Sequence, residues 1–508
     1  MPRRWLLLLL SAFALAAQSI PVRLGQPILL LPPTLDRAGQ KVVFGSAIAA
    51  DGTIFTTTDL YAINADGTGL RRLTQLAASP PPIPPHGVTA VSLSPDAARA
   101  AFTVFLAPSA SGGEQVHVLD VSTATDRTVA VDTAGCIQPL AVCANCFFSC
   151  LNSVHITADG SKVLYAASRQ QPFYVVNADG SGLTRLPEFS GSLAPAPQRV
   201  ISRAGQVVFT SSAPSGPTFA AQATNVYLMN LDGSNLQQVT RFGSDPSVFC
   251  SNAAISADGS TIAFQSNRDP DTGAPSQVSR IYVVHADGSG LRAPFESGYP
   301  ITAPSISGDG SIVVFGAGGQ IYAVRADGTA PKTLVSSLTS AWQEPVVSED
   351  GSRVSLMLGP QDGGRGAIYA INSDGSSLHA VYAPHALNPG GVTGAISFSA
   401  PSPGSLITAY GVNLAPGGGA TAASFPLPPS LAGVSLLLNG IPVPLLAVTN
   451  WQVNAQLPPA TPPGPAAFQL RFADGSMPPA VAADVQSVAP AIFSVVSTVG
   501  QRVVCQAA

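Results

Sequence analysis

The sequence predicts an all-β fold, a β-propeller of about seven four-stranded blades followed by a smaller β-sandwich. Three observations predict this fold. Two short elements, each built around a tight turn, alternate along residues 36–384. The composition favours strands and turns, because the 508 residues include 48 Gly and 46 Pro and only 10% are charged, against about 25% in an average soluble protein. After residue 385 the repeats stop, and short alternating strands separated by Pro and Gly follow.

The first repeated element is a strand that begins with Tyr, an Asp-Gly turn and a second short strand. Asp-Gly supplies the positive φ that two-residue hairpins need, and the twist of such turns matches the strands they join. Each turn offers one carboxylate and no closing Glu, so it is expected to be structural rather than a calcium loop. A degenerate copy begins at His117. The six pairs are Asp66 and Gly67, Asp179 and Gly180, Asp232 and Gly233, Asp287 and Gly288, Asp327 and Gly328, and Asp374 and Gly375.

The second repeated element consists of a short apolar strand, a Ser-x-Asp-Gly turn and another strand. Clear copies begin at Ile156, Ile255, Ile306 and Val347, and weaker copies at Leu93, Ile201 and Asp36. The two elements in series make a four-stranded antiparallel sheet, and several such sheets around an axis bury faces that one sheet cannot bury alone. The residues that lead successive copies of the first element lie about 40–57 positions apart, which suits four strands and their loops. We count seven blades, or six if the segment around His117 is an insertion.

These segments resemble the WD40-like repeats of TolB-type propellers, most clearly in residues 253–269 and 281–291. The repeats of that family typically carry a Trp-Ser-Pro-Asp-Gly turn. Here Leu, Ile or Val replaces the Trp, and the Pro is kept only at Pro95. The resemblance covers residues 36–384 and implies the propeller fold. It does not imply a TolB-like partner.

The C-terminal region predicts a second β-domain. Residues 386–394 are expected to be a linker, and residues 395–508 an all-β sandwich of short strands. Asn439 and Gly440 form a strong hairpin signal between two apolar runs.

Consecutive motifs in this region resemble an immunoglobulin-like C-terminal domain that recurs in secreted proteins of soil bacteria, of acidobacterial type. The motifs are Pro403–Leu406, Gly411–Leu414, Leu438–Pro442, Gln452–Gln456 and Ala489–Phe493. The resemblance implies an architecture and a location, and no reaction.

The N-terminus has the pattern of a Sec-type signal peptide. Arg3 and Arg4 form a positive segment, an apolar run follows, and Ala14 and Ala16 provide a small-x-small cleavage pattern. We therefore expect a signal peptide at residues 1–17 and a propeller at residues 18–385, with an uncleaved anchor as the alternative. The mature protein is expected to be secreted, or to lie in the periplasm or cell envelope, with no further membrane span.

The six cysteines point to disulfides, because an exported protein enters an oxidising compartment. Four of them, Cys136, Cys143, Cys146 and Cys150, lie close together in an insertion between the second and third repeats. Cys250 precedes its strand at nearly the same distance as Cys150, so the insertion is expected to close on itself or to pair with Cys250. A zinc site and free thiols are the alternatives.

No motif in the sequence indicates a catalytic residue, a cofactor or a metal. The net charge is −4 and no Lys/Arg cluster follows the N-terminus, which argues against nucleic-acid binding. The first hypothesis is a binding or scaffold protein that uses a propeller face for an unknown protein, peptide or glycan partner. The alternative is a hydrolase or lyase acting on polysaccharide or peptide through a site dispersed around the propeller axis. A surface-layer or adhesion role is a third. The charged loop candidates are Asp59, Glu114, Glu188, Arg268, Asp269 and Glu344.

Overall fold

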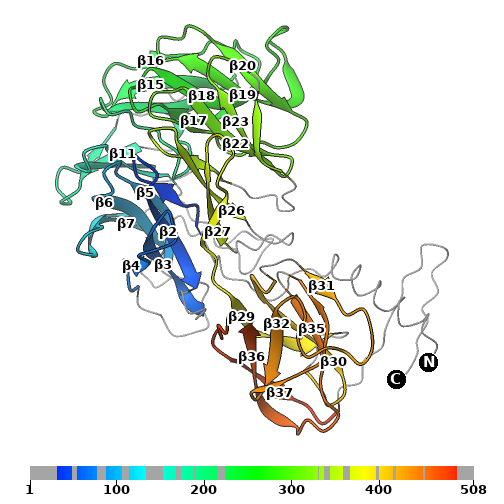
Figure 1. The fold of residues 1–508 in the computed structure, drawn as a ribbon. Coiled ribbons are helices and arrows are strands. Elements are labelled where there is room, and N and C mark those ends of the chain that lie inside the picture. The colour runs from blue at the N-terminus through cyan, green and yellow to red at the C-terminus, as the bar shows by residue number, and fades with distance from the viewer. Residues whose placement is uncertain are drawn as a thin grey trace. The chain divides into compact units, whose positions relative to one another are not determined.

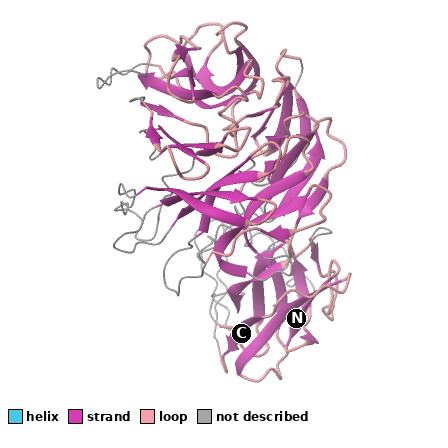
Figure 2. Ribbon diagram, turned by 90° about the vertical axis from the view of Figure 1, so that its left-hand side faces the viewer, coloured by secondary structure: helices cyan, strands magenta, loops and turns pink. Residues whose placement is uncertain are grey.

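The described part of the chain contains β-strands and loops, and no helix (Figure 2). The computed structural model describes residues 31–48, 54–76, 87–105, 114–132, 153–166, 173–186, 190–213, 223–329, 331–336, 344–358, 367–395, 400–415, 419–449 and 452–488. None of these residues belongs to a helix that is long and apolar enough to cross a membrane. The chain divides into two compact units, one within residues 28–47 and 56–382 and the other formed mainly by residues 383–508. The predicted signal peptide lies outside the described residues.

The first unit consists of antiparallel blades of four strands, called blades 1 to 7 in chain order (Figure 1). A parallel bridge from Thr58 to Gly87 joins blades 1 and 2 into one eight-stranded sheet. Blade 1 is β1 (Thr34–Leu35), β2 (Lys41–Ile48), β3 (Ile54–Asn64) and β4 (Arg71–Arg72), and blade 2 is β5 (Gly87–Leu93), β6 (Arg99–Phe105), β7 (Glu114–Asp120) and β8 (Thr125–Asp132). Blade 3 is β9 (Val154–Ile156), β10 (Lys162–Ala166), β11 (Phe173–Asn177) and β12 (Thr184–Arg185), and blade 4 is β13 (Ser190–Ser192), β14 (Gln206–Ala213), β15 (Asn225–Asn230) and β16 (Gln237–Gln238).

The remaining three blades follow the same order. Blade 5 is β17 (Cys250–Ile255), β18 (Thr261–Arg268), β19 (Pro275–His285) and β20 (Arg292–Ser297). Blade 6 is β21 (Ser305–Ile306), β22 (Ile312–Ala317), β23 (Gln320–Arg325) and β24 (Lys332–Val335), and blade 7 is β25 (Val346–Val347), β26 (Arg353–Leu358), β27 (Ala367–Asn372) and β28 (His379–Tyr382). The predicted propeller is confirmed, and the described residues form seven blades rather than six, because His117 lies in β7 of a complete blade 2.

An aromatic pair across the two middle strands recurs from blade to blade. In blade 5, Phe264 of β18 lies opposite Tyr282 of β19, and their rings stack with centroids 5.5 Å apart. In blade 2 the degenerate repeat places His117 opposite Phe102, with ring centroids 5.0 Å apart. Cross-strand aromatic pairs stabilise sheets beyond the apolar area that they bury. The Tyr that opens each repeat is therefore a packing residue of its blade.

The Asp-Gly turns have a geometry different from the two-residue hairpin expected from the sequence. In blade 7 the Gly375 N–H donates to the Asn372 carbonyl (2.8 Å) and the Asn372 N–H to the Ser376 carbonyl (2.9 Å), which leaves a three-residue loop. Only Gly375 has positive φ, at 80°. The Asp374 carboxylate accepts from the Ser376 N–H and hydroxyl. The turn is thus a tight turn followed by a left-handed Gly, and the Asp caps it rather than adopting positive φ.

The Ser-x-Asp-Gly turns pack against the neighbouring blade, so the substitution Gly310→Ala is expected to destabilise strongly. Gly310 has φ +72°, and a Cβ there would lie 2.6 Å from the Thr261 Cβ in blade 5. We expect a loss of about 2–4 kcal/mol in urea unfolding, from backbone strain plus overpacking. Gly375→Ala is the control, since φ is +80° but the nearest contact is the flexible Lys332 side chain at 3.5 Å. Equal losses in the two variants would show that the inter-blade contact contributes nothing.

The ring closes between blades 7 and 1 without a shared strand, because each of these blades is built from one continuous stretch of chain. Side chains close it instead, together with a backbone hydrogen bond from the Asp350 N–H to the Arg37 carbonyl (2.9 Å). Phe44 of blade 1 packs on Tyr382 of blade 7, with ring centroids 4.7 Å apart, within a core that both blades share. Across the same seam, the His379 ring bonds to the Ala65 carbonyl (2.8 Å) and the Arg353 guanidinium donates to the Gly39 carbonyl (3.2 Å).

The second unit consists of two sheets that share one hydrophobic core. The first has the order β29 (Ala386–Gly394), β30 (Leu406–Val412), β35 (Gln452–Gln456), β34 (Leu445–Val448) and β31 (Ala420–Thr421). The second has the order β33 (Ile441–Pro442), β32 (Val434–Leu438), β36 (Gly464–Phe472) and β37 (Val481–Val485). Ile407 and Val453 of the first sheet and Leu436 and Phe468 of the second belong to the same buried cluster. The unit is a β-sandwich, and its likeness to immunoglobulin domains stays a prediction.

Two local features of the sandwich bear on the sequence analysis. Asn439 and Gly440 both have positive φ, at 48° and 84°, and join β32 to β33 as the predicted hairpin. Residues 386–394, expected to be a linker, instead form the edge strand β29, which pairs with β30. The composition misled here because Asn388 to Gly391 form an irregularity in the pairing, which tolerates Pro and Gly inside a strand.

Candidate functional site

The propeller has two chemically different ends. Because neighbouring strands within a blade are antiparallel, successive connections alternate between the two ends. The Asp-Gly and Ser-x-Asp-Gly turns lie at one end, which we call the turn face. The other end, the loop face, carries the connections between second and third strands and those between blades. Its described segments include 241–249, 269–274 and 298–304 around blade 5.

On the turn face, the x residues of the Ser-x-Asp-Gly turns surround the propeller axis. Hydrogen bonds between backbone N–H groups and backbone carbonyls link these turns from blade to blade. The N–H of Arg37 donates to the carbonyl of Pro95 (2.7 Å), and that of Arg203 to the carbonyl of Ala257 (2.8 Å). The N–H of Gly308 donates to the carbonyl of Glu349 (2.6 Å), and that of Asp350 to the carbonyl of Arg37 (2.9 Å). The x residue is thus held at the axis by its backbone, and its side chain determines the chemistry there.

Three arginines converge on one buried carboxylate at this point. The Glu349 side chain, 3% exposed, lies 3.2 Å from Arg37 Nε and 3.5 Å from Arg199 Nη2, and it also pairs with Arg203. These residues come from blades 7, 1 and 4. Burial, and next the nearby Arg203, lower the pKa of Arg199 to about 10, so its guanidinium still carries a charge at neutral pH. Such a cluster ties blades together across the axis.

The axial cavity is narrow. It is lined by residues of the innermost strands and turns, among them Thr34, Ser92, His155, Gln198 and Val347, together with the Glu349 cluster. Its volume is about 60 Å³, room for a few water-sized groups at about 10–15 Å³ each. An oligosaccharide or a peptide does not fit inside it.

The carboxylates that line this cavity are already engaged. Glu349 is in ion pairs, and Asp36 Oδ1 accepts from the backbone N–H groups of Gln40 (2.7 Å) and Lys41 (3.1 Å). A hydrolase or lyase at the axis calls for two carboxylates that face a substrate. Nothing in this part of the propeller favours that alternative.

His155 makes stability depend on pH. Its ring is 2% exposed and donates to the Ala194 carbonyl (3.0 Å), and burial lowers its pKa to about 4. Unfolded chains take up the proton below about pH 6.5, whereas the folded chain stays neutral until about pH 4. Stability should therefore fall by about 2 kcal/mol between pH 7 and pH 5.

Urea unfolding at the two pH values measures this fall, and His155→Gln should remove most of it. In this variant His117 still makes the free energy of unfolding fall with decreasing pH, by a smaller amount, because burial also lowers the pKa of His117. A His155→Gln variant with the full slope of the parent would contradict the assignment.

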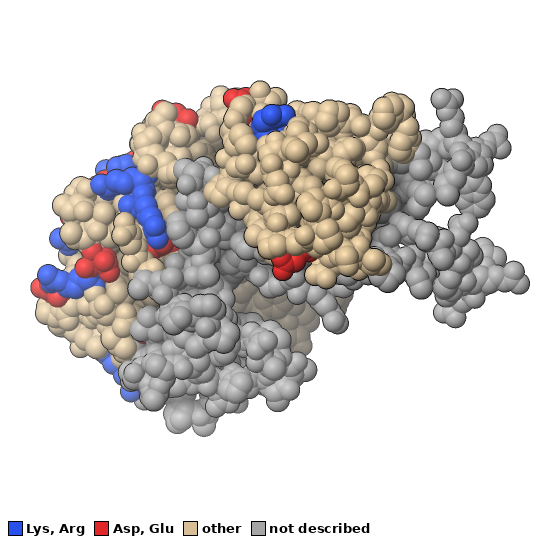
Figure 3. Space-filling model, turned by 90° about the horizontal axis from the view of Figure 1, so that it is seen from below, with Lys and Arg blue, Asp and Glu red and all other residues tan. Residues whose placement is uncertain are grey.

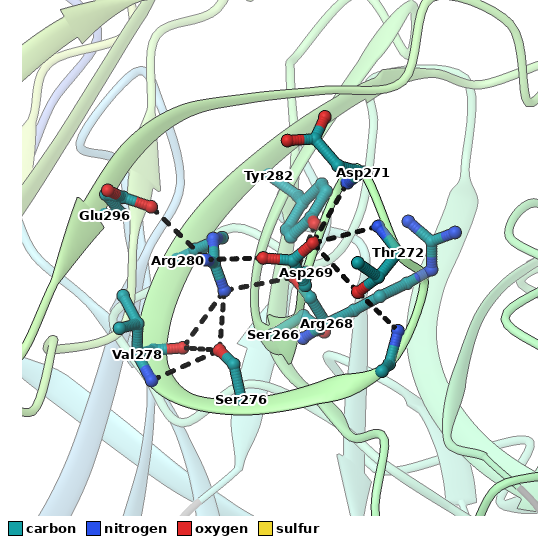
Figure 4. Close-up of polar contacts among 11 residues, drawn as sticks. Ser266, Arg268, Asp269, Asp271, Thr272, Ser276, Val278, Arg280, Tyr282 and Glu296 are labelled. Carbon is teal, nitrogen blue, oxygen red and sulfur yellow. Dashed lines mark hydrogen bonds and ion pairs between the residues drawn. The ribbon is translucent and has the colours of Figure 1, made fainter.

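On the loop face, a network of polar contacts holds the end of blade 5 (Figure 4). The Arg280 side chain, 6% exposed, lies 3.2 Å from both Asp269 and Glu296 and donates to the Ser276 hydroxyl (2.7 Å). The Tyr282 hydroxyl donates to the Arg268 carbonyl (2.6 Å). These contacts fix both strands that flank the loop 269–274.

The loop itself is capped by Asp269. Its carboxylate accepts from the Thr272 N–H (2.9 Å) and hydroxyl (3.0 Å) and from the Asp271 N–H (3.1 Å). The hydrogen bonds from Thr272, with the charge of Arg280, lower the pKa of Asp269. The carboxylate therefore stays ionised and serves the loop's own structure.

Exposed aromatic side chains lie in the connections before and after blade 5, one next to β18 through Asn267 and the other against Gly318 in blade 6. Phe249 lies in the connection that enters blade 5 and is 43% exposed, and Tyr299 lies in the connection that leaves it and is 68% exposed. The Arg268 guanidinium lies over the Phe242 ring, 4.9 Å from its centroid. We call Phe249, Arg268 and Tyr299 the blade 5 rim. Charged residues make up only 10% of the chain, and on the face seen in Figure 3 most of the described surface is uncharged.

None of the charged loop candidates within the described residues lines the axial cavity. Asp59 is fully buried in blade 1, where it pairs with Arg72 and accepts from Thr74 and Leu76, so its role is structural. Arg268 and Asp269 are neighbours in one hairpin of blade 5, and Arg280 donates to the carbonyl of the first and to the carboxylate of the second. Glu114 is buried at the start of β7, Glu344 is partly buried, and Glu188 lies outside the described residues.

The cysteine prediction is only partly visible. Cys136, Cys143, Cys146 and Cys150 lie outside the described residues, so their pairing stays a prediction. Cys250 is a buried free thiol, and burial raises its pKa to about 12. The structure therefore does not give Cys250 the disulfide that its position suggested. Within the described residues, no group of three or more His, Cys, Asp or Glu side chains is arranged to hold a metal.

Sequence reasoning missed the axial cluster of Arg37, Arg199, Arg203 and Glu349. A signal for three of them was present, because the x position of the Ser-x-Asp-Gly turn is Pro, Ala or Gly in four copies and charged in the other three. Arg199 carries no such signal, since it precedes its turn within an irregular inner segment of blade 4.

Comparison with known proteins supports the propeller. Residues 227–411 match the family model described as the lipoprotein LpqB β-propeller domain. Similar solved structures include an oligogalacturonate lyase in complex with manganese, with 15% identity, 66% of this chain and 86% of that chain covered and a TM-score of 0.45. TolB from Acinetobacter baumannii has 17% identity and a TM-score of 0.37, and the match covers 59% of this chain and 62% of that chain. The β-propeller domain of the Trilobed protease from Pyrococcus furiosus has 13% identity and a TM-score of 0.47, and the match covers 70% of this chain and 98% of that chain.

A search of curated protein sequences found no match. The structural likenesses, at such low identity, concern the fold. Together with the seven blades of the described residues, the family match shows that this chain contains a β-propeller.

Proposed function

We propose that this protein is an exported binding protein of the cell envelope whose loop face takes a protein or peptide partner. The observation that carries the proposal is the blade 5 rim, where two aromatic side chains are exposed on the same face as a loop held rigid by Arg280. Tyr and Arg are enriched among the residues that dominate binding energy at interfaces. A rigid support lowers the entropy cost of binding, since the loop is already ordered.

The location is supported by two independent features. The N-terminal residues have the pattern of a secretory signal peptide, and the matched family model is named for a lipoprotein. N-terminal sequencing of the mature protein from fractionated cells tests this location. Cleavage after Ala16 or Ala17, with the protein in the envelope or medium, supports export, and an intact N-terminus in the cytoplasm contradicts it.

The binding proposal is tested by affinity capture from envelope extracts of the source organism, with variants chosen by face. The rim variant is Phe249→Ser with Tyr299→Ser. The control variant is Leu183→Ser with Leu378→Ser, which removes apolar side chains that are 54% and 45% exposed on the turn face. A partner recovered with the parent and the control, and reduced at least about tenfold with the rim variant, supports the proposal. Equal recovery with the rim variant contradicts it.

A further inference from the structure

The turn-face end of the axial cavity carries more positive than negative charge. Arg37, Arg199 and Arg203 line it against two carboxylates, Glu349 and Asp36. Asp36 is committed to the backbone of its own turn. Glu349 therefore pairs with three guanidinium groups, each of which carries five N–H donors. Outside the cavity lining, Asp258 and Asp96 also interact electrostatically with Arg199 and Arg37.

Three polar atoms of residues that line this cavity have no hydrogen-bond partner within the described residues. One is Glu349 Oε1, which is in ion pairs with Arg37 and Arg203. Arg199 Nη1 is buried and unpaired, and so is Oε1 of Gln198, a residue that is 2% exposed. A buried donor without an acceptor is costly to a fold. The Gln198 amide can turn to present its NH₂ group, because its oxygen and nitrogen are interchangeable in shape. Both side chains line the cavity, so both can donate to the same guest.

The volume of the cavity and the exposure of its arginines determine which ligand it can bind. About 60 Å³ accommodates roughly four to six water-sized groups, which is the size of a phosphate or sulfate ion. The Arg37 and Arg203 side chains are 58% and 48% exposed, whereas Arg199 is 23% exposed. The two outer arginines can therefore attract an anion from solvent, and the inner one can bind it.

We propose that the turn-face end of the axial cavity is a binding site for a small oxyanion, held by Arg37, Arg199 and Arg203 with the amide of Gln198. Guanidinium groups match oxyanions because their N–H donors form paired, charge-assisted hydrogen bonds. The site lies at the end of the propeller opposite the blade 5 rim. Its failure would therefore leave the proposed partner binding untouched.

The test is isothermal titration of the whole mature protein with sodium phosphate, at constant ionic strength set with chloride. The parent should bind one phosphate per chain in a saturable manner. Arg199→Met should weaken binding at least about tenfold, because it removes charge-assisted hydrogen bonds. Arg325→Met is the matched control, since Arg325 is exposed and does not line the cavity, and its affinity should equal that of the parent.

A second variant separates binding from a structural role of the cluster. Glu349→Gln removes the competing carboxylate, so phosphate should bind severalfold tighter and raise the melting temperature of this variant more than that of the parent. A purely structural ion cluster predicts no phosphate binding in any of these proteins. Titrations with sulfate and malonate then tell a general oxyanion site from one that selects phosphate.

Two results would overturn the proposal. One is the absence of saturable binding of phosphate, sulfate and malonate to the folded parent. The other is binding that Arg199→Met leaves unchanged, which would mean an adventitious ion only. Circular dichroism and urea unfolding show first that Arg199→Met is folded, and Arg203→Met replaces it if it is not.

Discussion

Replacing Phe44 by Ala is expected to lower the free energy of unfolding by about 3–5 kcal/mol, as for other fully buried Phe side chains. Phe44 is completely buried and packs on Tyr61 and Tyr382 at the seam between blades 1 and 7. No strand is shared across this seam, so side-chain packing carries more of the closure than it would in a ring closed by a common sheet. Urea unfolding followed by fluorescence measures the loss.

The blades that lose hydrogen-exchange protection distinguish weakening of the seam from a general loss of core packing. Phe264→Ala is the control, since Phe264 is equally buried and stacks on Tyr282 inside blade 5. Native-state hydrogen exchange should show Phe44→Ala opening blades 1 and 7 first, and Phe264→Ala opening blade 5. If blades 1 and 7 keep their protection in Phe44→Ala, the seam is not the weak point of the ring.

Replacing Arg280 by Met is expected to cost about 2–3 kcal/mol and to release the loop 269–274. The buried guanidinium contacts Asp269, Glu296 and Ser276 at once. Hydrogen bonds to charged groups contribute about 1.5–3 kcal/mol each, and water that hydrates the released partners in the variant offsets part of this loss. The loss should appear in urea unfolding and as faster hydrogen exchange in the loop. Affinity for the captured partner should fall with it, because the rim loses its support.

Glu296→Gln is the matched control for the same network. Glu296 is 68% exposed on its side chain, and exposed ion pairs contribute about 0–1 kcal/mol. It should therefore leave stability and loop exchange almost unchanged. A loss as large as that of Arg280→Met would assign the effect to the ion pair with Glu296 rather than to the buried hydrogen bonds.

The blades could be predicted because the repeat encodes them locally. Each strand carries its own β-branched and aromatic residues, and each turn carries its own Asp and Gly, so a blade is legible without knowing its neighbours. The loop length of the turns was less legible. An Asp-Gly pair such as Asp374 and Gly375 fits both a two-residue hairpin and a three-residue loop. The hydrogen bond from the Ser376 N–H to the Asp374 carboxylate favours the three-residue loop.

The candidate sites depend on contacts between distant blades, which no local pattern reports. Arg37 and Glu349 are more than 300 positions apart in the chain and meet because blades 1 and 7 are neighbours in the ring. Arg199 reaches the same carboxylate from blade 4 across the axis. The boundary after blade 7 was misjudged for a similar reason, since residues 386–394 become a strand only by pairing with β30.

The sequence by itself determined an all-β chain, a repeat of six or seven blades and the structural Asp-Gly turns, because these follow from short-range propensities and from a period that can be counted. Only the tertiary structure decided that His117 belongs to a full blade, that the ring closes without a shared strand and that arginines from blades 1 and 4 enclose Glu349. Those features depend on which blades become neighbours around the axis. That arrangement is a property of the closed ring, and no single repeat contains it.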